Sequence, residues 1–187
     1  MRSQRGSAEA FARLVEIFEV RLFNFILRKV GSRPEAEDLT QETFLRAWQR
    51  IDSYRPRWRF STWLYTIATR LAISHARRSN TTWRPAAHHG EPACTAPESK
   101  PDRSWIWRMV DEVLTDDQRT AVWLRYVEDL GISEIATVMN KSQVGVRVML
   151  FRARAALAER MRDMEPDEVE LSVATVAVGQ PIAGGVP

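Results

Sequence analysis

Apolar side chains recur at steps of three and four residues through most of the chain, which is the period of an α-helix. The first stripe predicts an amphipathic helix over residues 8–30. Its members are Phe11, Leu14, Val15, Phe18, Leu22, Phe25 and Ile26. Ser32 and Pro34 then favour the start of a second helix. The stripe of that helix is Ala36, Leu39, Phe44, Ala47, Trp48 and Ile51.

A loop over residues 52–60, interrupted by Pro56, separates the second helix from a third. We expect Ser61 to cap this third helix. Its inner face would consist of Leu64, Ile67, Ala68 and Leu71. These three helices are expected to form one small domain.

The helical period resumes near Trp105 and continues to about residue 162. Thr115 and Gln118 have the spacing of a capping box, so a helix over 116–127 is expected. A short helix over 132–139, a turn over 140–142 and a long helix over 143–162 follow. The buried stripe predicted for the long helix is Val146, Leu150, Ala153, Leu157 and Met161. Only LSVATVAV in the tail has a strand-like pattern.

Between the two helical halves, the pattern is lost. Four of the nine prolines lie in residues 79–104 among Ser, Thr, Ala and His, which indicates a linker. The predicted fold is therefore all-α, with two small helical domains joined by a flexible linker. The domains would span residues 1–78 and 105–164, and we expect the tail over 165–187 to be disordered.

Net charge changes the picture once it is counted by region. The 187 residues carry 27 basic and 24 acidic side chains, a net of only +3. Residues 50–78 nevertheless hold seven Arg and one Asp, and residues 135–162 hold six bases and one acid. A phosphate backbone responds to such clusters rather than to the total. Arginine outnumbers lysine 24 to 3, which favours bidentate phosphate contacts or reflects genome composition.

Composition excludes several classes of protein. One cysteine cannot form a disulfide framework or a Cys-cluster zinc site. No apolar run reaches the ~20 residues of a membrane span, and the N-terminus lacks the apolar stretch of a signal peptide. We therefore expect a cytoplasmic protein without membrane insertion.

No pattern of catalytic residues stands out. His88, His89 and Cys94 lie in the linker without a fourth ligand, so a metal site is not expected. The acids at 116–117 and 165–170 occupy helix boundaries, where caps and solvated ends are common. We expect no enzyme activity, no cofactor and no small-molecule substrate.

The end of the second domain has the pattern of a helix-turn-helix. Ile135, Ala136 and Met139 can pack the short helix against Val146 and Leu150 of the long one. The alternative is an ordinary helical hairpin with a solvated basic face. If the segment binds duplex DNA, Gln143 and Arg147 would face base edges, and Lys141, Arg152 and Arg154 suit phosphates.

Two longer motifs carry a family resemblance. Residues 35–78 read EAEDLTQETFLRAWQRIDSYRPRWRFSTWLYTIATRLAISHARR, and they resemble the core- and promoter-binding region of bacterial extracytoplasmic-function sigma factors. LTDDQRTAVWLRYVEDLGISEIATVM and VGVRVMLFRARAAL resemble the other conserved region of that group. Both occur in the expected order, and the resemblance covers most of residues 8–160.

The resemblance implies three sets of binding residues. AEDLTQETF looks like the helix that docks on RNA polymerase, and its implied contacts are Asp38, Gln41, Glu42, Phe44 and Trp48. Phe44 and Trp48 could equally be core residues. The implied minus-ten residues are Tyr54, Arg55, Arg57, Trp58, Arg59, Phe60, Trp63, Arg70, Ser74, His75, Arg77 and Arg78. The minus-thirty-five set is Lys141, Ser142, Gln143, Gly145, Arg147, Met149, Arg152 and Arg154.

Aromatic residues suit the melting of the minus-ten element. Base–aromatic stacking is worth ~1–3 kcal/mol per base, comparable with the cost of unstacking one. Tyr54, Trp58, Phe60 and Trp63 would offer the stacking surfaces, although Trp63 is as well suited to the core. The neighbouring arginines would attract the backbone.

The chain departs from the family's pattern at several positions. Arg70 and Ser74 stand where many relatives have the Asn and Asp of NLAID. Val148 and Met149 replace a frequent Ser-Arg pair, Phe151 replaces a commonly polar residue, and Gly131 replaces a capping Ser. The groove face is therefore expected to be more apolar than usual, with Met149 either touching a thymine methyl or buried.

The expected function is that of a dissociable promoter-specificity subunit. Its implied partners are core RNA polymerase, promoter DNA and an anti-sigma factor. The alternatives are a free-standing helix-turn-helix regulator, which has no use for AEDLTQETF, and a protein that only titrates polymerase. The acidic tail could dock back onto the basic surfaces.

Overall fold

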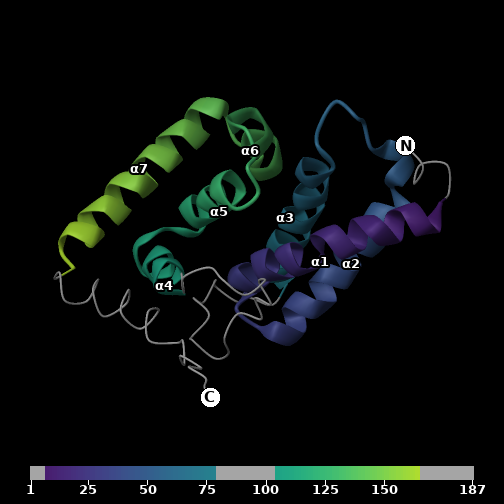
Figure 1. Ribbon diagram of the computed structural model, residues 1–187, viewed down its shortest axis with the longest axis horizontal. Coiled ribbons are helices and arrows are strands. Elements are labelled where there is room, and N and C mark those ends of the chain that lie inside the picture. Colours follow the sequence, from purple (N-terminus) through teal and green to yellow (C-terminus); the bar gives the residue numbers. More distant parts are fainter. Residues whose placement is uncertain (1–6, 79–103, 165–187) are drawn as a thin grey trace, which may run out of the picture.

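The computed structural model describes residues 7–78 and 104–164, and all of the regular structure in these two ranges is helical (Figure 1). The elements are α1 (Ala8–Val30), α2 (Arg33–Gln49), the 3-10 turn η2 (Ile51–Ser53), α3 (Phe60–Arg78), α4 (Ser104–Val113), α5 (Asp116–Tyr126), α6 (Ile132–Met139) and α7 (Gln143–Arg162). The all-α prediction is confirmed. The strand-like segment of the tail and nearly all of the predicted linker lie outside the described residues.

Local sequence signals set most helix ends. The Ser7 hydroxyl accepts from the Ala10 N–H at the start of α1, and Gly31 ends that helix with a left-handed φ of 74°. The capping box of Thr115 and Gln118 is present at the start of α5. One expectation was wrong: α3 begins at Phe60, and Ser61 is buried inside it instead of capping it.

The buried apolar residues of both halves belong to one hydrophobic cluster, to which each half contributes a part. Leu22, Ile26, Leu64 and Tyr65 are fully buried among α1, α2 and α3. In the second half, Leu124, Ile135, Val146, Leu150 and Ala153 are buried among α5, α6 and α7. The expected stripe of α7 ends earlier than predicted. Leu157 is only half-buried and Met161 is 53% exposed, because α7 extends beyond the helices that cover its first three turns.

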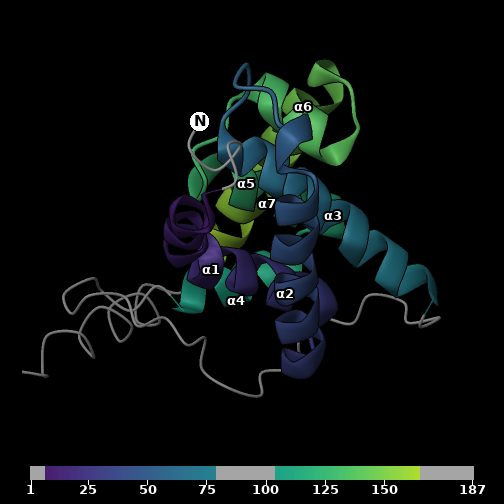
Figure 2. The same ribbon diagram turned by 90° about the vertical axis from the view of Figure 1, so that its right-hand side faces the viewer.

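The two helical groups pack against each other. Helix α3 contacts α6, and the C-terminal half of α1 faces α4 and α5 (Figure 2). Within the described residues, four ion pairs cross this boundary: Arg21 to Glu128 at 2.6 Å, Arg28 to Asp111 at 2.8 Å, Lys29 to Asp116 at 3.2 Å, and Arg59 to Asp129 at 4.0 Å. The Glu128 side chain is fully buried. The surfaces of the first group must therefore be considered together with those of the second.

Candidate functional site

Helix α2 presents polar side chains on its solvent face. Asp38 and Gln41 are exposed, and Glu42 is half-buried and accepts from Arg46 Nε at 2.6 Å. Phe44, which the resemblance placed among the polymerase contacts, is 8% exposed and lies in the core. Its ring is covered by its own protein, so the core interpretation of Phe44 fits this arrangement.

The apolar member of this face is Leu45, which sequence reasoning missed. Leu45 is 51% exposed and follows Gln41 by one helical turn. Its position opposite the buried residues Thr40, Thr43 and Ala47 could have revealed it. Trp48 continues the surface: it is half-buried, lies 5.0 Å from the Phe11 ring, and lines an open groove with Val15.

The loop over residues 54–59, called the Trp58 loop below, precedes α3 and is organised by a buried tyrosine. Tyr54 is 3% exposed, its hydroxyl donates to the Trp58 carbonyl at 2.7 Å, and burial raises its pKa. Its ring lies 5.8 Å from Phe60 and 5.5 Å from Trp63. Tyr54 therefore supports the loop in this arrangement, and it does not present the free stacking face that the sequence suggested.

Trp58 lies outside the aromatic cluster that Tyr54 forms with Phe60 and Trp63. It is half-exposed at the loop tip, with the Arg57 guanidinium 5.8 Å from its ring. Phe60 and Trp63 are half-buried and pack on each other and on Tyr54. Trp63 thus packs in the cluster and keeps part of its surface exposed.

The basic residues of the loop are exposed, and one of them contacts the second helical group. Arg55 and Arg57 are exposed, whereas Arg59 also donates to the Asp129 carbonyl at 2.9 Å. Thr62, in the first turn of α3, donates to Glu134 of α6 at 2.7 Å. The expected promoter-melting segment therefore touches the expected helix-turn-helix.

The C-terminal half of α3 carries a second basic surface. Arg70, Ser74 and Arg77 are spaced by four and three residues, are exposed and share one helix face. Arg78 is exposed as well, and His75 is half-buried with its Nε2 3.9 Å from Glu35. These side chains lie together in the C-terminal half of α3, whereas the Trp58 loop precedes its N-terminal end.

Helices α6 and α7 form the predicted helix-turn-helix. Asn140 turns the chain with a φ of 52°, and the Ser142 hydroxyl accepts from the Gly145 N–H at 3.0 Å. A side chain at Gly145 would bring a Cβ to 3.1 Å from that hydroxyl, so a glycine suits this first turn. Buried Ile135 and Ala136 face buried Val146 and Leu150 across the pair of helices.

The expected DNA-facing residues of α7 are largely free of the core. Gln143, Arg147, Arg152 and Arg154 are exposed. Lys141 is exposed too, although its ammonium lies 2.8 Å from Asp117. Met149 is half-buried and packs against the core.

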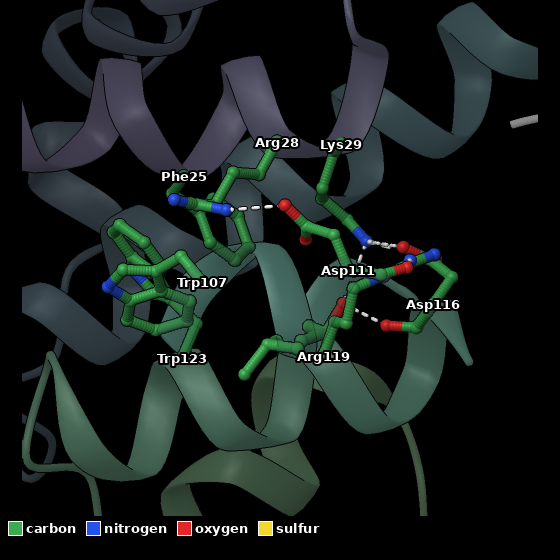
Figure 3. A pocket seen from close by; sticks show the side chains of 10 residues that line it. Phe25, Arg28, Lys29, Trp107, Asp111, Asp116, Arg119 and Trp123 are labelled. Atoms are coloured by element: carbon green, nitrogen blue, oxygen red, sulfur yellow. Dashed lines mark hydrogen bonds and ion pairs between the residues drawn. The ribbon is translucent and has the colours of Figure 1, made fainter. Parts of the chain in front are cut away.

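A small pocket lies where α1 meets α4 and α5 (Figure 3). Arg28 lies over the Trp107 ring at 4.6 Å and pairs with Asp111, while Lys29 pairs with Asp116 and donates to Thr120. Burial lowers the pKa of Arg119, whose guanidinium donates to the Asp111 carbonyl at 2.7 Å. The cavity of about 20 Å³ has room for roughly one water molecule, so it is a packing feature and not a small-molecule site.

Membrane-spanning helices and metal-binding clusters are absent from the described ranges. In residues 7–78 and 104–164, no helix has both the length and the apolar character needed to cross a bilayer. Within the same ranges, His, Cys, Asp and Glu side chains form no group of three or more that could hold a metal ion. His88, His89 and Cys94 lie outside them.

Each helical group matches a region of a known protein family. Residues 14–82 match sigma-70 region 2, and residues 105–157 match sigma-70 region 4. The ECF RNA polymerase sigma factor SigW of Bacillus subtilis (strain 168) is 31% identical over 175 residues, covering 86% of this chain and 94% of that protein. The RNA polymerase sigma-H factor of Pseudomonas aeruginosa is 34% identical over 178 residues, covering 87% and 92%.

A solved structure agrees on the fold. The sigma factor RpoE of Bartonella quintana, in complex with the anti-sigma factor NepR, matches with a TM-score of 0.68 and 21% identity over 83% of this chain and 99% of that one. Together with the two matched regions, these similarities settle the family. The chain belongs to the extracytoplasmic-function (ECF) sigma factors, non-catalytic initiation factors that associate with RNA polymerase.

Proposed function

We propose that this sigma factor directs promoter-specific initiation through three separate surfaces. The solvent face of α2 docks on core polymerase, the Trp58 loop and α3 open the minus-ten element, and α6 with α7 reads the minus-thirty-five element. Residues 1–78 and 105–164 act as the two functional units. The observation that carries the proposal is that all three surfaces hold exposed side chains suited to these partners.

The α2 face has the composition of a protein-docking surface. Leu45 supplies an exposed apolar centre, and Asp38, Gln41 and Glu42 surround it with polar groups. Interfaces commonly combine an apolar anchor with a polar rim. Trp48 and the groove beside it extend the apolar area toward α1. We assign polymerase docking to this face, with Leu45 in the place that the resemblance gave to Phe44.

The Trp58 loop suits an unpaired strand. Trp58 offers a partly exposed ring, and Arg55 and Arg57 beside it supply positive charge. Stacking of one flipped base on such a ring is worth ~1–3 kcal/mol, which offsets the cost of unstacking it. Arg70, Ser74 and Arg77 extend the DNA-binding surface along α3. Opening of the minus-ten element therefore needs no energy source beyond binding.

Engagement of promoter DNA requires the two helical groups to move apart. Arg59 and Thr62 of the minus-ten segment contact Asp129 and Glu134 of the second group. DNA cannot occupy the same part of α3 while α6 is packed there. The packed arrangement is thus the free state, and docking on polymerase separates the groups.

An anti-sigma factor controls this protein in the cytoplasm, by analogy with its family. The neighbour RpoE was solved in complex with such a protein, NepR. A partner that binds the packed arrangement would keep α2 and α3 away from polymerase and DNA. Co-purification of the tagged chain from its native cells, with and without stress, tests this regulation.

Run-off transcription tests the proposed function. Purified core polymerase is supplied with the chain and a library of genomic fragments, and binding to core is measured on the same preparation. We expect a set of transcripts that core alone does not make. Failure to bind core together with an unchanged set of transcripts would overturn the proposal.

A further inference from the structure

Helix α7 carries an apolar stripe on the face that points away from the core. Val144 is 66% exposed, Val148 42% and Phe151 66%. Their spacing of four and three residues places them one above another on the helix. The buried residues Val146, Leu150 and Ala153 occupy the opposite face. Figure 1 shows α7 at the outer edge of the second helical group.

Arginines lie on both sides of the stripe. At 100° per residue, Arg147 is turned about 70° to one side of its centre line and Arg152 about 70° to the other. Both guanidinium groups are exposed. The helix holds no acidic residue before Glu159, so its first four turns present apolar and basic groups with only Gln143 as a neutral polar side chain. An apolar centre between two positive flanks complements a groove bounded by two phosphate strands.

We propose that this stripe reads thymine 5-methyl groups in the major groove of the minus-thirty-five element. The inference rests on the proposed function, since it names what α7 recognises there. The thymine methyl is the apolar group that a base pair displays in that groove, and aliphatic and phenyl side chains contact it. Arg152 contacts the phosphates on one side, and Arg147 contacts those on the other side in place of the base edges expected from the sequence, so that the helix is fixed between them.

The length of the stripe sets the size of the element that it reads. From Val144 to Phe151 the helix rises about 10 Å at 1.5 Å per residue. Base pairs are spaced about 3.4 Å apart along each strand. The three side chains therefore span about three adjacent base pairs, and thymines on either strand can place methyl groups against them. Charge favours DNA over a protein helix as the occupant, because two flanking arginines would need acidic partners on both sides.

The test removes methyl groups without changing hydrogen bonds. Holoenzyme reconstituted from core polymerase and the full chain selects duplexes from a randomised minus-thirty-five region. Each selected thymine is then replaced by deoxyuridine, which lacks only the 5-methyl group. Loss of one buried methyl is expected to weaken binding about fourfold, and two such replacements about tenfold or more.

Variants tie the effect to the stripe. Val148→Ala and Phe151→Ala should bind thymine and deoxyuridine duplexes with nearly equal affinity. The matched control is Met161→Ala, which truncates a residue of the same helix that is 53% exposed but lies beyond the stripe. This control should keep the full preference for thymine. Val148, Phe151 and Met161 are all substantially exposed, so each variant should retain the fold. Circular dichroism checks that it does.

Each outcome decides the inference. Equal binding of thymine and deoxyuridine duplexes by the unaltered holoenzyme would overturn it while leaving the proposed function intact. The inference is overturned as well if the stripe variants keep the thymine preference but lose a protein partner, because the stripe would then be a protein-docking surface. If the chain binds no core polymerase and the mixture selects no duplex, the proposed function fails first, and the inference fails with it.

Discussion

Phe44 and Leu45 are neighbours in sequence with opposite environments. Phe44 is 8% exposed and packs in the core, whereas Leu45 is 51% exposed among polar side chains. Similarity to the family drew attention to the aromatic residue. The structure shows that the side chain available to a partner is the leucine.

Truncation of these two side chains should therefore have different effects. Leu45→Ala should weaken binding to core polymerase about tenfold, because it removes the apolar centre of the docking face without disturbing the core. Ile17→Ala, at a residue that is 59% exposed on α1, is the matched control and should leave binding unchanged. Phe44→Ala should instead lower the free energy of unfolding by about 3 kcal/mol. Fluorescence anisotropy and urea denaturation measure the two effects. Unchanged polymerase binding by Leu45→Ala would contradict the assigned docking face.

In the Trp58 loop, Trp58 is available for stacking on a base, whereas buried Tyr54 supports the loop. Trp58→Ala should reduce opening of the minus-ten element by about tenfold, because it removes one stacking surface worth ~1–3 kcal/mol. Tyr54→Phe should lower stability by about 1 kcal/mol through loss of its hydrogen bond to the Trp58 carbonyl, with little effect on opening. Permanganate reactivity of unpaired thymines reports the opening. A Trp58→Ala variant that opens DNA normally would refute the role given to Trp58.

At the scale of elements, apolar period and capping residues predict most helix bounds. α1 and α6 match the predicted ranges, and α7 begins after Ser142 as its cap requires. The sequence could not show where a helix extends beyond the helices that cover it. Met161 was therefore wrongly predicted to be buried. The sequence also could not decide which aromatic in and beside the loop is buried, because Tyr54, Phe60 and Trp63 are all large aromatic side chains that suit either a core or a stacking surface. Only the tertiary arrangement around them distinguishes their roles.

The capping box of α5 gives an element-scale prediction. Thr115→Ala should lower the free energy of unfolding by about 1 kcal/mol, because the Gln118 N–H loses the hydroxyl that it donates to. Thr137→Ala, in the exposed face of α6, should change it by less than about 0.5 kcal/mol. Urea denaturation of both variants gives the comparison. Equal stability of the two would show that the box adds nothing to α5.

At the scale of the whole molecule, the contacts between the two helical groups were beyond the reach of sequence reasoning. Arg21 and Glu128 are 107 positions apart, yet they form a bidentate pair with the carboxylate fully buried. A stripe pattern identifies which residues are buried, but it does not identify the partner surface. The same limit applies to the contact between α3 and α6, which joins two surfaces that were each expected to face DNA.

Removal of Arg21 should loosen the packed arrangement. Arg21→Ala leaves the Glu128 carboxylate buried without its partner, which we expect to cost about 2 kcal/mol after allowance for the 44% exposure of the arginine side chain. Arg13→Ala breaks an exposed pair with Glu9 on the same helix and should cost less than about 0.5 kcal/mol. Small-angle scattering should show a larger radius of gyration for Arg21→Ala alone. An unchanged radius and stability would mean that this pair does not hold the two groups together.

The most direct test of the central claim is the mapping of transcript 5′ ends made by purified core polymerase with this chain on genomic DNA. The account predicts new start sites, absent with core alone, that share a common element near minus ten and another near minus thirty-five at a constant spacing. Identical start sites with and without the chain would contradict it.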